Sequence, residues 1–292
     1  MAIDKLQDKI RKLKNPSMLD FSMDTEKIPP HILFEEVNIC AAYERFCREL
    51  LSALKNLIPA VRFSVSRCML MGAEGLNVLE RLTAYASEQG YYVLLDVPEI
   101  LSAESAEHAV EILFQKDTLW KFHGLVLSFY IGSDAIKPFV DRMKDSEKDL
   151  FLTVRTANRS ASELQDLLTG SRLVYTAAAD MAKRFGEAFL CRCGYSRIAG
   201  LGPATSADVL RGLRTKYPEL FLLVDGFEYS GANAKNCSYA FDKLGHGAIA
   251  CAGSMITTAW KNETDVDSDP VMMAQQAAER MKKNLTRYVT VL

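Results

Sequence analysis

Two charged residues stand within or at the end of apolar runs, where a folded chain has to compensate their charge. Asp96 ends the run "YYVLLD", two residues before Pro98, and Arg62 interrupts the run "PAVRFSV". Because a buried charge needs a partner, we expect Arg62 and Asp96 to form an ion pair. If they are instead accessible, a guanidinium and a carboxylate could form a pocket for an anion or a polar ligand. Both interpretations place the two runs side by side.

Metal, disulfide and histidine chemistry have little support in the sequence. The four histidines lack an acid, serine or cysteine partner at motif spacing, and the seven cysteines include no Cys-x-x-Cys pair. We therefore expect structural histidines, reduced thiols, no metal and no cofactor. The residues concerned are His31, His108, His123, His246, Cys40, Cys47, Cys68, Cys191, Cys193, Cys237 and Cys251.

The composition of the 292 residues is that of an ordinary globular protein, with 49% hydrophobic and 25% charged residues. A formal net charge of -2 provides no general attraction to nucleic acid or to anionic membranes. No apolar stretch approaches the roughly 18 residues of a membrane span, and the start "MAIDKLQDKIRKLK" resembles neither a secretory signal nor a transit peptide. We expect a cytoplasmic protein without nucleic-acid or membrane partners.

Eight short apolar runs, each followed by a segment with helical spacing, organise the chain. Continuous apolar runs separated by helices indicate a parallel sheet covered by helices. Eight such units predict a single-domain (β/α)8 TIM barrel over residues 1–292. An open doubly wound sheet is the main alternative, but no Gly-x-Gly-x-x-Gly follows the first run. The runs span residues 17–22, 59–65, 91–97, 124–129, 150–155, 197–202, 220–225 and 247–252.

Two expected helix starts carry the pattern of a capping box, in which a hydroxyl and an acid three residues later bond reciprocally. These pairs are Ser160 with Glu163 and Thr205 with Asp208. In a barrel, ligands bind at the C-terminal ends of the strands. The polar residues expected there are Ser22, Arg62, Asp96, Ser128, 155–158, 225–229 and 251–254.

Several segments together resemble the longer bacterial orotidine 5′-phosphate decarboxylases. "FLTVRTANRSASELQDLL" (151–168) is similar to the fifth strand and following loop of that family, and "CGYSRIAGLGPAT" (193–205) to its sixth strand. "NPSMLDFSMDTEKIP" (15–29) resembles the first strand, and residues 221–260 resemble the last two. The resemblance runs nearly end to end and implies the same barrel that the hydrophobic pattern predicts.

The resemblance also implies a catalytic pattern, Asp-x-Lys-x-x-Asp, in which the lysine offsets the charge of a carbanion and protonates it. Here Asp96 keeps the first acid, whereas Pro98 replaces the lysine and Leu101 the second acid. Arg62 replaces a further lysine, and a guanidinium does not deprotonate in proteins. The substrate-binding aspartate of the first strand is matched to Ser22.

The segments that hold phosphate in the family differ as well. Where the family has Gly-Tyr-Gly-Ala-Gln-Gly-Gly, this chain has "GFEYSGA" (226–232), with Glu228 among its residues. Where the family has Asn-Ser-Ser-Arg, Ser254 replaces the arginine, whose bonds to phosphate are roughly twice as strong as neutral ones. The remaining ligand-binding residues that the resemblance implies are Ser22, Arg155, Thr156, Asn158, Gly226 and Ser254.

Simpler roles compete with ligand binding at several of these positions. Arg155 could order its loop, and Thr156 and Asn158 could shape the turn before the next helix. The resemblance implies a homodimer with shared active sites, in which Leu101 and the expected helix 102–114 would supply an apolar contact. A small anionic or phosphorylated ligand is the partner that such a site would take.

Two functions follow from these substitutions. The first is a catalytically impaired relative of orotidine 5′-phosphate decarboxylase, the enzyme that forms uridine 5′-phosphate, acting as a binding or interaction protein. The second is an active decarboxylase or other lyase that uses Arg62 and Asp96 in a rebuilt site, with Glu99, Asp225 or Glu228 as further candidates. The fold alone does not decide between them.

Overall fold

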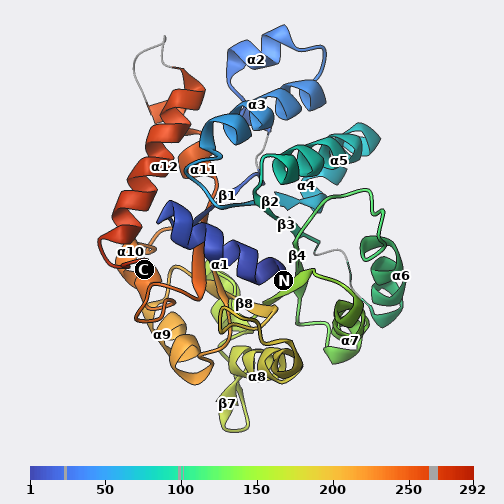
Figure 1. The fold of residues 1–292 in the computed structure, drawn as a ribbon, viewed down its shortest axis with the longest axis vertical. Coiled ribbons are helices and arrows are strands. Elements are labelled where there is room, and N and C mark those ends of the chain that lie inside the picture. The colour runs from blue at the N-terminus through green and yellow to red at the C-terminus, as the bar shows by residue number, and fades with distance from the viewer. Residues whose placement is uncertain (23–24, 98–99, 101, 263–268) are drawn as a thin grey trace.

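The computed structural model describes residues 1–22, 25–97, 100, 102–262 and 269–292. Eight parallel strands close into one barrel in the order β1-β10-β9-β8-β5-β4-β3-β2, with helices around the outside (Figure 1). This confirms the predicted (β/α)8 barrel and excludes the open sheet. Each predicted run overlaps one strand, although two of the strands extend one residue beyond their runs. The strands are β1 (Ser17–Asp20), β2 (Ala60–Ser64), β3 (Tyr92–Asp96), β4 (Gly124–Ser128), β5 (Asp149–Thr153), β8 (Ile198–Pro203), β9 (Leu222–Asp225) and β10 (Ala248–Ala252).

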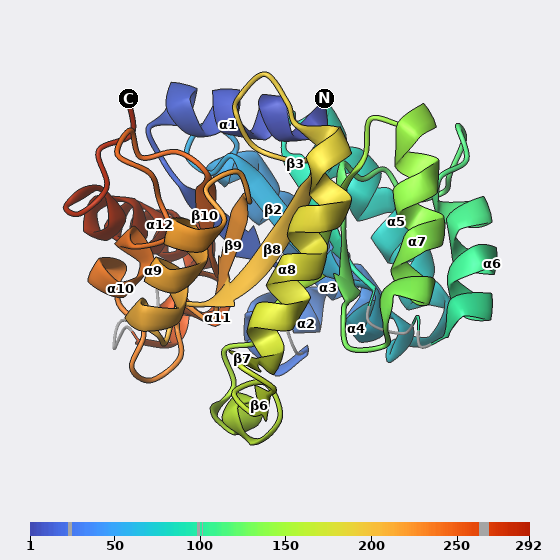
Figure 2. The ribbon, with the colours of Figure 1, turned by 90° about the horizontal axis from the view of Figure 1, so that it is seen from below.

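The helices alternate with the strands, and a small hairpin interrupts the connection between β5 and α8. The α-helices are α1 (Ala2–Leu13), α2 (Pro30–Glu35), α3 (Ile39–Leu54), α4 (Val65–Met69), α5 (Gly72–Glu88), α6 (Ala103–Leu113), α7 (Ser133–Arg142), α8 (Val174–Gly186), α9 (Ala207–Lys216), α10 (Ala234–Ser238), α11 (Ser254–Thr257) and α12 (Pro270–Thr286). The 3-10 helices are η1 (Thr25–Lys27), η2 (Met143–Asp145), η3 (Arg159–Glu163), η4 (Glu187–Phe189) and η5 (Ala259–Asn262). The hairpin, β6 (Leu168–Thr169) with β7 (Arg172–Leu173), projects from the barrel (Figure 2).

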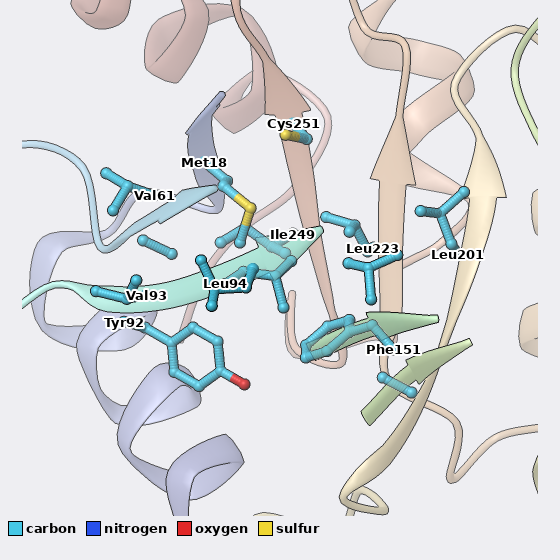
Figure 3. Packing of buried hydrophobic residues seen from close by; sticks show 14 of the residues in the cluster. Met18, Val61, Tyr92, Val93, Leu94, Phe151, Leu201, Leu223, Ile249 and Cys251 are labelled. Atoms are coloured by element: carbon cyan, nitrogen blue, oxygen red, sulfur yellow. The ribbon is translucent and has the colours of Figure 1, made fainter. Parts of the chain in front are cut away.

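The strands are apolar throughout because both of their faces are covered. Side chains that alternate along a strand point either into the barrel or toward the surrounding helices, and neither direction leads to water. Met18, Leu94 and Ile249, from three different strands, are fully buried, and Figure 3 shows them gathered among the strands. This packing accounts for apolar runs without the alternation of a half-exposed sheet.

Neither capping box forms as predicted. At α9 the cap is Ser206, whose hydroxyl accepts from the backbone N–H of Val209, and not Thr205. Ser160 lies inside η3, which begins after Asn158 and has no side-chain cap. A neighbouring hydroxyl can cap the helix without the acid of the capping box, so the sequence motif locates a helix start only to within about a residue or two.

Helix α1 closes the N-terminal end of the barrel and leaves the other end free. It lies across the end opposite the β6–β7 hairpin (Figure 2). The carboxylate of Asp4 accepts from the N–H of Cys193 at 2.9 Å, and the amide oxygen of Gln7 accepts from the N–H of Gly247 at 3.1 Å. These bonds anchor the helix to the loops before β8 and β10, so the C-terminal ends of the strands form the accessible mouth.

A buried polar network lies at the closed end. The hydroxyl of Tyr92 donates to Asp149 at 2.9 Å, and Nε of Arg197 lies 3.4 Å from the other carboxylate oxygen. The Arg197 guanidinium also donates to the backbone carbonyls of Met143 and Ser146. Burial raises the pKa of Asp149 to about 7, although the bond from Tyr92 and the charge of Arg197 act in the opposite direction.

Two findings concern only the described ranges. No helix there has the length and apolar character to cross a membrane, and no three His, Cys, Asp or Glu residues gather as metal ligands. All seven cysteines are free thiols, which confirms the prediction of unpaired cysteines.

Asp149 should lower the stability of the protein as the pH rises from about 4 to about 7. Its native pKa of about 7 lies above the ordinary value of 3.8, so the native state holds this proton more tightly than the unfolded state does. The resulting stabilisation is complete below the unfolded pKa and is lost as the pH rises through the native pKa. The loss amounts to at most about 4 kcal/mol.

The measurement is thermal unfolding of the wild type and Asp149→Asn across this pH range. The difference in Tm, wild type minus variant, should fall with rising pH and level off above the native pKa. The exposed Asp145→Asn serves as the control and should leave that pH dependence unchanged. A difference for Asp149→Asn that stays flat would contradict the prediction.

Candidate functional site

The candidate site is a cavity of about 590 Å³ at the C-terminal mouth of the barrel, the end where such barrels bind ligands. Every barrel strand, or the loop that follows it, contributes to its wall. The lining residues are Asp20, Ser22, Lys27, Arg62, Ser64, Arg67, Asp96, Val126, Ser128, Thr153, Thr156, Leu201, Asp225, Glu228, Tyr229, Gly253 and Ser254.

Arg62 forms the centre of the cavity floor and is held between two carboxylates. Its Nη2 lies 2.5 Å from Asp20 and 3.0 Å from Asp225. The side chain is 9% exposed, and its Nε is buried without a hydrogen-bond partner within the described part of the chain. The strand register explains the first pair, since Asp20 of β1 lies directly opposite Arg62 of β2.

The two partners fix each other's charge. Burial opposes the charged forms of both Asp20 and Arg62, but their mutual attraction outweighs it. The guanidinium lowers the pKa of Asp20 below its ordinary value, and the carboxylates of Asp20 and Asp225 raise the pKa of Arg62 well above its own. Arg62 is therefore a permanent cation whose charge is already compensated.

The predicted ion pair between Arg62 and Asp96 is wrong. In the register of β2 with β3, Asp96 lies opposite Ser64, two residues beyond Arg62, which is about 6–7 Å further along the strand. Asp96 does line the cavity, so its predicted place at the mouth is correct. Arg62 pairs instead with acids on β1 and β9.

Asp20 is the functional residue that the sequence reasoning missed. The resemblance matched the acid of the first strand to Ser22, whose N–H donates to Asp20 at 2.8 Å. Both residues line the cavity. A signal was present, because Asp20 ends its strand as Asp96 and Asp225 end theirs.

Gly226 makes the turn that brings the loop after β9 over the cavity. Its φ of 75° is in the left-handed region, and a Cβ there would lie 2.5 Å from the Cβ of Ala157. Only glycine accommodates both constraints. Gly226 is not among the lining residues, so its role in the described structure is to shape the loop.

The same loop places Glu228 against the loop that follows β10. One carboxylate oxygen of Glu228 accepts from the N–H of Met255 at 2.8 Å. Beside it, Nζ of Lys27 donates to the hydroxyl of Ser254 at 2.8 Å. Ser254, predicted as a ligand-binding residue, thus lines the cavity with its hydroxyl already bonded.

The loop after β5 is held together by its own side chains. Arg155 forms a bidentate pair with Asp166, with both N···O distances at 2.8 Å. Gln165 accepts from the N–H of Thr156 at 2.8 Å, and the Thr156 hydroxyl donates to Asn158. Of the three residues of this loop that were predicted to bind a ligand, Arg155, Thr156 and Asn158, only Thr156 lines the cavity. For Arg155 and Asn158 the geometry favours the loop-ordering interpretation.

The segment after β3 is described only in part. Pro98, Glu99 and Leu101, which carry most of the predicted departure from the catalytic pattern, lie outside the described residues. The charge of the cavity can be stated for the residues that line it: four carboxylates, Asp20, Asp96, Asp225 and Glu228, face three cations. The cations are Lys27, Arg62 and Arg67.

The fold and the site define the chain as a (β/α)8 barrel with a polar cavity at the C-terminal ends of its strands. No protein-family model matches it. It is 26% identical over 288 residues to an orotidine 5′-phosphate decarboxylase of Clostridium novyi, covering 98% of this chain and 99% of the relative. The corresponding protein of Caldicellulosiruptor saccharolyticus is 24% identical and covers 98% of each chain.

Solved structures of the same name share the fold. The OMP decarboxylase of Leishmania donovani matches with a TM-score of 0.73 and 21% identity, covering 98% of this chain and 99% of that one. The orotidine 5′-monophosphate decarboxylase of Plasmodium berghei matches with a TM-score of 0.77 and 13% identity, covering 99% of each. The chain is thus similar over nearly its whole length to proteins named orotidine 5′-phosphate decarboxylase, which confirms the resemblance seen in its motifs.

Replacing Arg62 with methionine should destabilise the protein by about 3–5 kcal/mol, because it leaves Asp20 and Asp225 without their cation at a buried site. Adding Asp20→Asn to that variant should recover part of the loss. The measurement is a double-mutant cycle on the free energy of unfolding in denaturant. Arg155→Met is the matched control, since Asp166 is 32% exposed and its loss of a partner should cost less. Additive effects of the Arg62 and Asp20 changes would contradict the pairing.

Proposed function

We propose that this chain is an orotidine 5′-phosphate decarboxylase-like barrel that binds a small polar ligand and does not catalyse the decarboxylation after which its relatives are named. The observation that carries the proposal is the position of Arg62 between Asp20 and Asp225. The cation at the floor of the cavity is already neutralised by the chain itself. It offers little additional attraction to a substrate carboxylate or to the carbanion that forms when carbon dioxide leaves.

Decarboxylation also requires a group that protonates the carbanion, and the residues at the matching positions support the same conclusion. In the family, as the resemblance implies, a lysine on the third strand both stabilises the carbanion and protonates it. The matching residue here is Pro98, and a guanidinium such as that of Arg62 does not release its proton. Losing one preorganised donor typically costs about 2.7–4 kcal/mol of transition-state stabilisation. The loss of the lysine, the second acid and the phosphate arginine together would leave little of the reaction.

One observation favours the alternative of an active decarboxylase or other lyase. The ammonium of Lys27 lines the same cavity as Arg62 and Asp96, and an ammonium can deliver a proton. A rebuilt site could use Lys27 in the role that the family gives to the lysine of its third strand. Under both functions the cytoplasmic location and a link to pyrimidine biosynthesis remain predictions.

The purified protein should not convert orotidine 5′-phosphate to uridine 5′-phosphate. The assay follows product formation at high enzyme concentration, with the Clostridium novyi relative run in parallel as the positive control. Turnover that persists after repurification and disappears in Asp96→Ala would overturn the proposal. Turnover that disappears in Lys27→Met would support the alternative function, in which Lys27 delivers the proton.

We also propose a homodimer that joins the two barrels at their mouths. Phe34, Val37 and Leu70 are 89%, 90% and 80% exposed. All three lie in connections that lead from the end of a strand to the following barrel helix, which places them on the C-terminal face. Leu164 and Leu168 are also exposed and lie in the connection between β5 and α8. Several large apolar side chains exposed at one end of a molecule are typical of an interface.

Charge placed in this face should dissociate the dimer. The variant Leu70→Glu with Leu168→Glu should sediment as a monomer at micromolar concentration, whereas the wild type should sediment as a dimer. Leu244→Glu is the matched control, because Leu244 is exposed on the connection that enters β10 at the opposite face. A monomeric wild type at micromolar concentration would contradict the dimer.

A further inference from the structure

The loops after β9 and β10 are the part of a (β/α)8 barrel that most often holds a phosphate group. These strands are the seventh and eighth of this barrel. Here Glu228, from the loop after β9, reaches the loop after β10 and accepts from the N–H of Met255 at 2.8 Å. Its other carboxylate oxygen would lie 3.7 Å from a Cβ placed on Gly253. A carboxylate of the chain thus occupies the place that an anionic ligand would take.

The groups around Glu228 strengthen this exclusion. Lys27, a cation that lines the cavity, donates to the hydroxyl of Ser254, the neighbour of Met255, at 2.8 Å. The guanidinium of Arg62 is held by Asp20 and Asp225. A phosphate monoester would enter a cavity whose lining carboxylates outnumber its lining cations, beside a Met255 N–H that already donates to Glu228. Its charge would be desolvated against a lining of net negative charge, which is unfavourable.

Several acceptors and hydroxyls are among the polar groups that line the cavity. Asp225 bonds to Arg62 through one carboxylate oxygen, and its other oxygen has no hydrogen bond among the described residues. Ser128 and Thr153 line the cavity at the ends of β4 and β5, again without a side-chain hydrogen bond in the described ranges. An acceptor beside hydroxyls suits a ligand that presents hydrogen-bond donors of its own.

The geometry points to an unphosphorylated ligand bearing hydroxyl or amino groups, from which Glu228 actively excludes the phosphorylated form. This inference rests on the proposed function and narrows it. It replaces the expectation of an anionic or phosphorylated ligand that the family resemblance suggested. In this chain, Glu228 acts as a selectivity residue that distinguishes a small molecule from its phosphate ester.

The test measures the response of the full-length chain to inorganic phosphate by thermal shift, because a ligand that binds the native state raises its apparent stability. The variants are Glu228→Ala, which removes the carboxylate, and Glu228→Gln, which removes only its charge. Glu279→Gln is the matched control, since Glu279 is exposed on α12. The apparent affinity for phosphate should rise at least about tenfold in Glu228→Ala, less in Glu228→Gln, and not in the control.

The same measurement with uridine and uridine 5′-phosphate provides a second readout on a pair that differs only in phosphate. The ratio of the two responses should shift toward the nucleotide in Glu228→Ala relative to the wild type. Equal phosphate responses of wild type and both Glu228 variants, including no response in any of them, overturn the inference. The decarboxylation assay is independent of this result: turnover by the wild type overturns the proposed function, whereas the phosphate response bears only on Glu228.

Discussion

The charge of one buried guanidinium has to be compensated at the C-terminal mouth of this barrel. Arg62 lines the cavity and is largely buried, and a buried cation without a partner would destabilise the fold. Asp20 on β1 and Asp225 on β9 provide the opposite charge. The cluster therefore joins the first strands of the chain to one of its last strands, which the closed barrel brings together. The closed sheet holds these strand ends at fixed register. The cavity therefore has a rigid polar floor whose strongest charges are directed at each other.

Other polar groups at the cavity also bond to one another. This pairing limits the kinds of ligand that the cavity can bind. Glu228 accepts from the N–H of Met255, and Lys27 donates to the hydroxyl of Ser254. In an enzyme that stabilises a charged transition state, preorganised groups point at the place where charge develops. Here the corresponding groups point at one another. A ligand that carries its own strong charge would have to break these bonds, whereas a neutral donor can use the acceptors that remain.

The fold could be predicted from the sequence because its determinants are local. Each apolar run corresponds to one strand, and the count of eight together with the missing Gly-x-Gly-x-x-Gly favours the barrel over the open sheet. The pairing at the mouth could not be predicted, because it depends on register. Asp96 and Asp20 both end apolar runs, yet only Asp20 lies level with Arg62. A shift of two residues along a strand is invisible in composition or periodicity, but it decides which acid reaches the guanidinium.

The loop after β5 shows why the presence of a family motif does not by itself indicate the family chemistry. Its two halves, "TVRTAN" and "ELQDLL", bond to each other through Arg155 with Asp166 and Thr156 with Gln165. The motif is thus a self-contained structural unit that orders the connection to α8, and it would serve this purpose in an active or an inactive barrel. Similarity in such a unit therefore says little about the chemistry of the site. The chemistry depends on the residues that face the cavity, where Arg62 and Glu228 differ from the pattern that the resemblance implies.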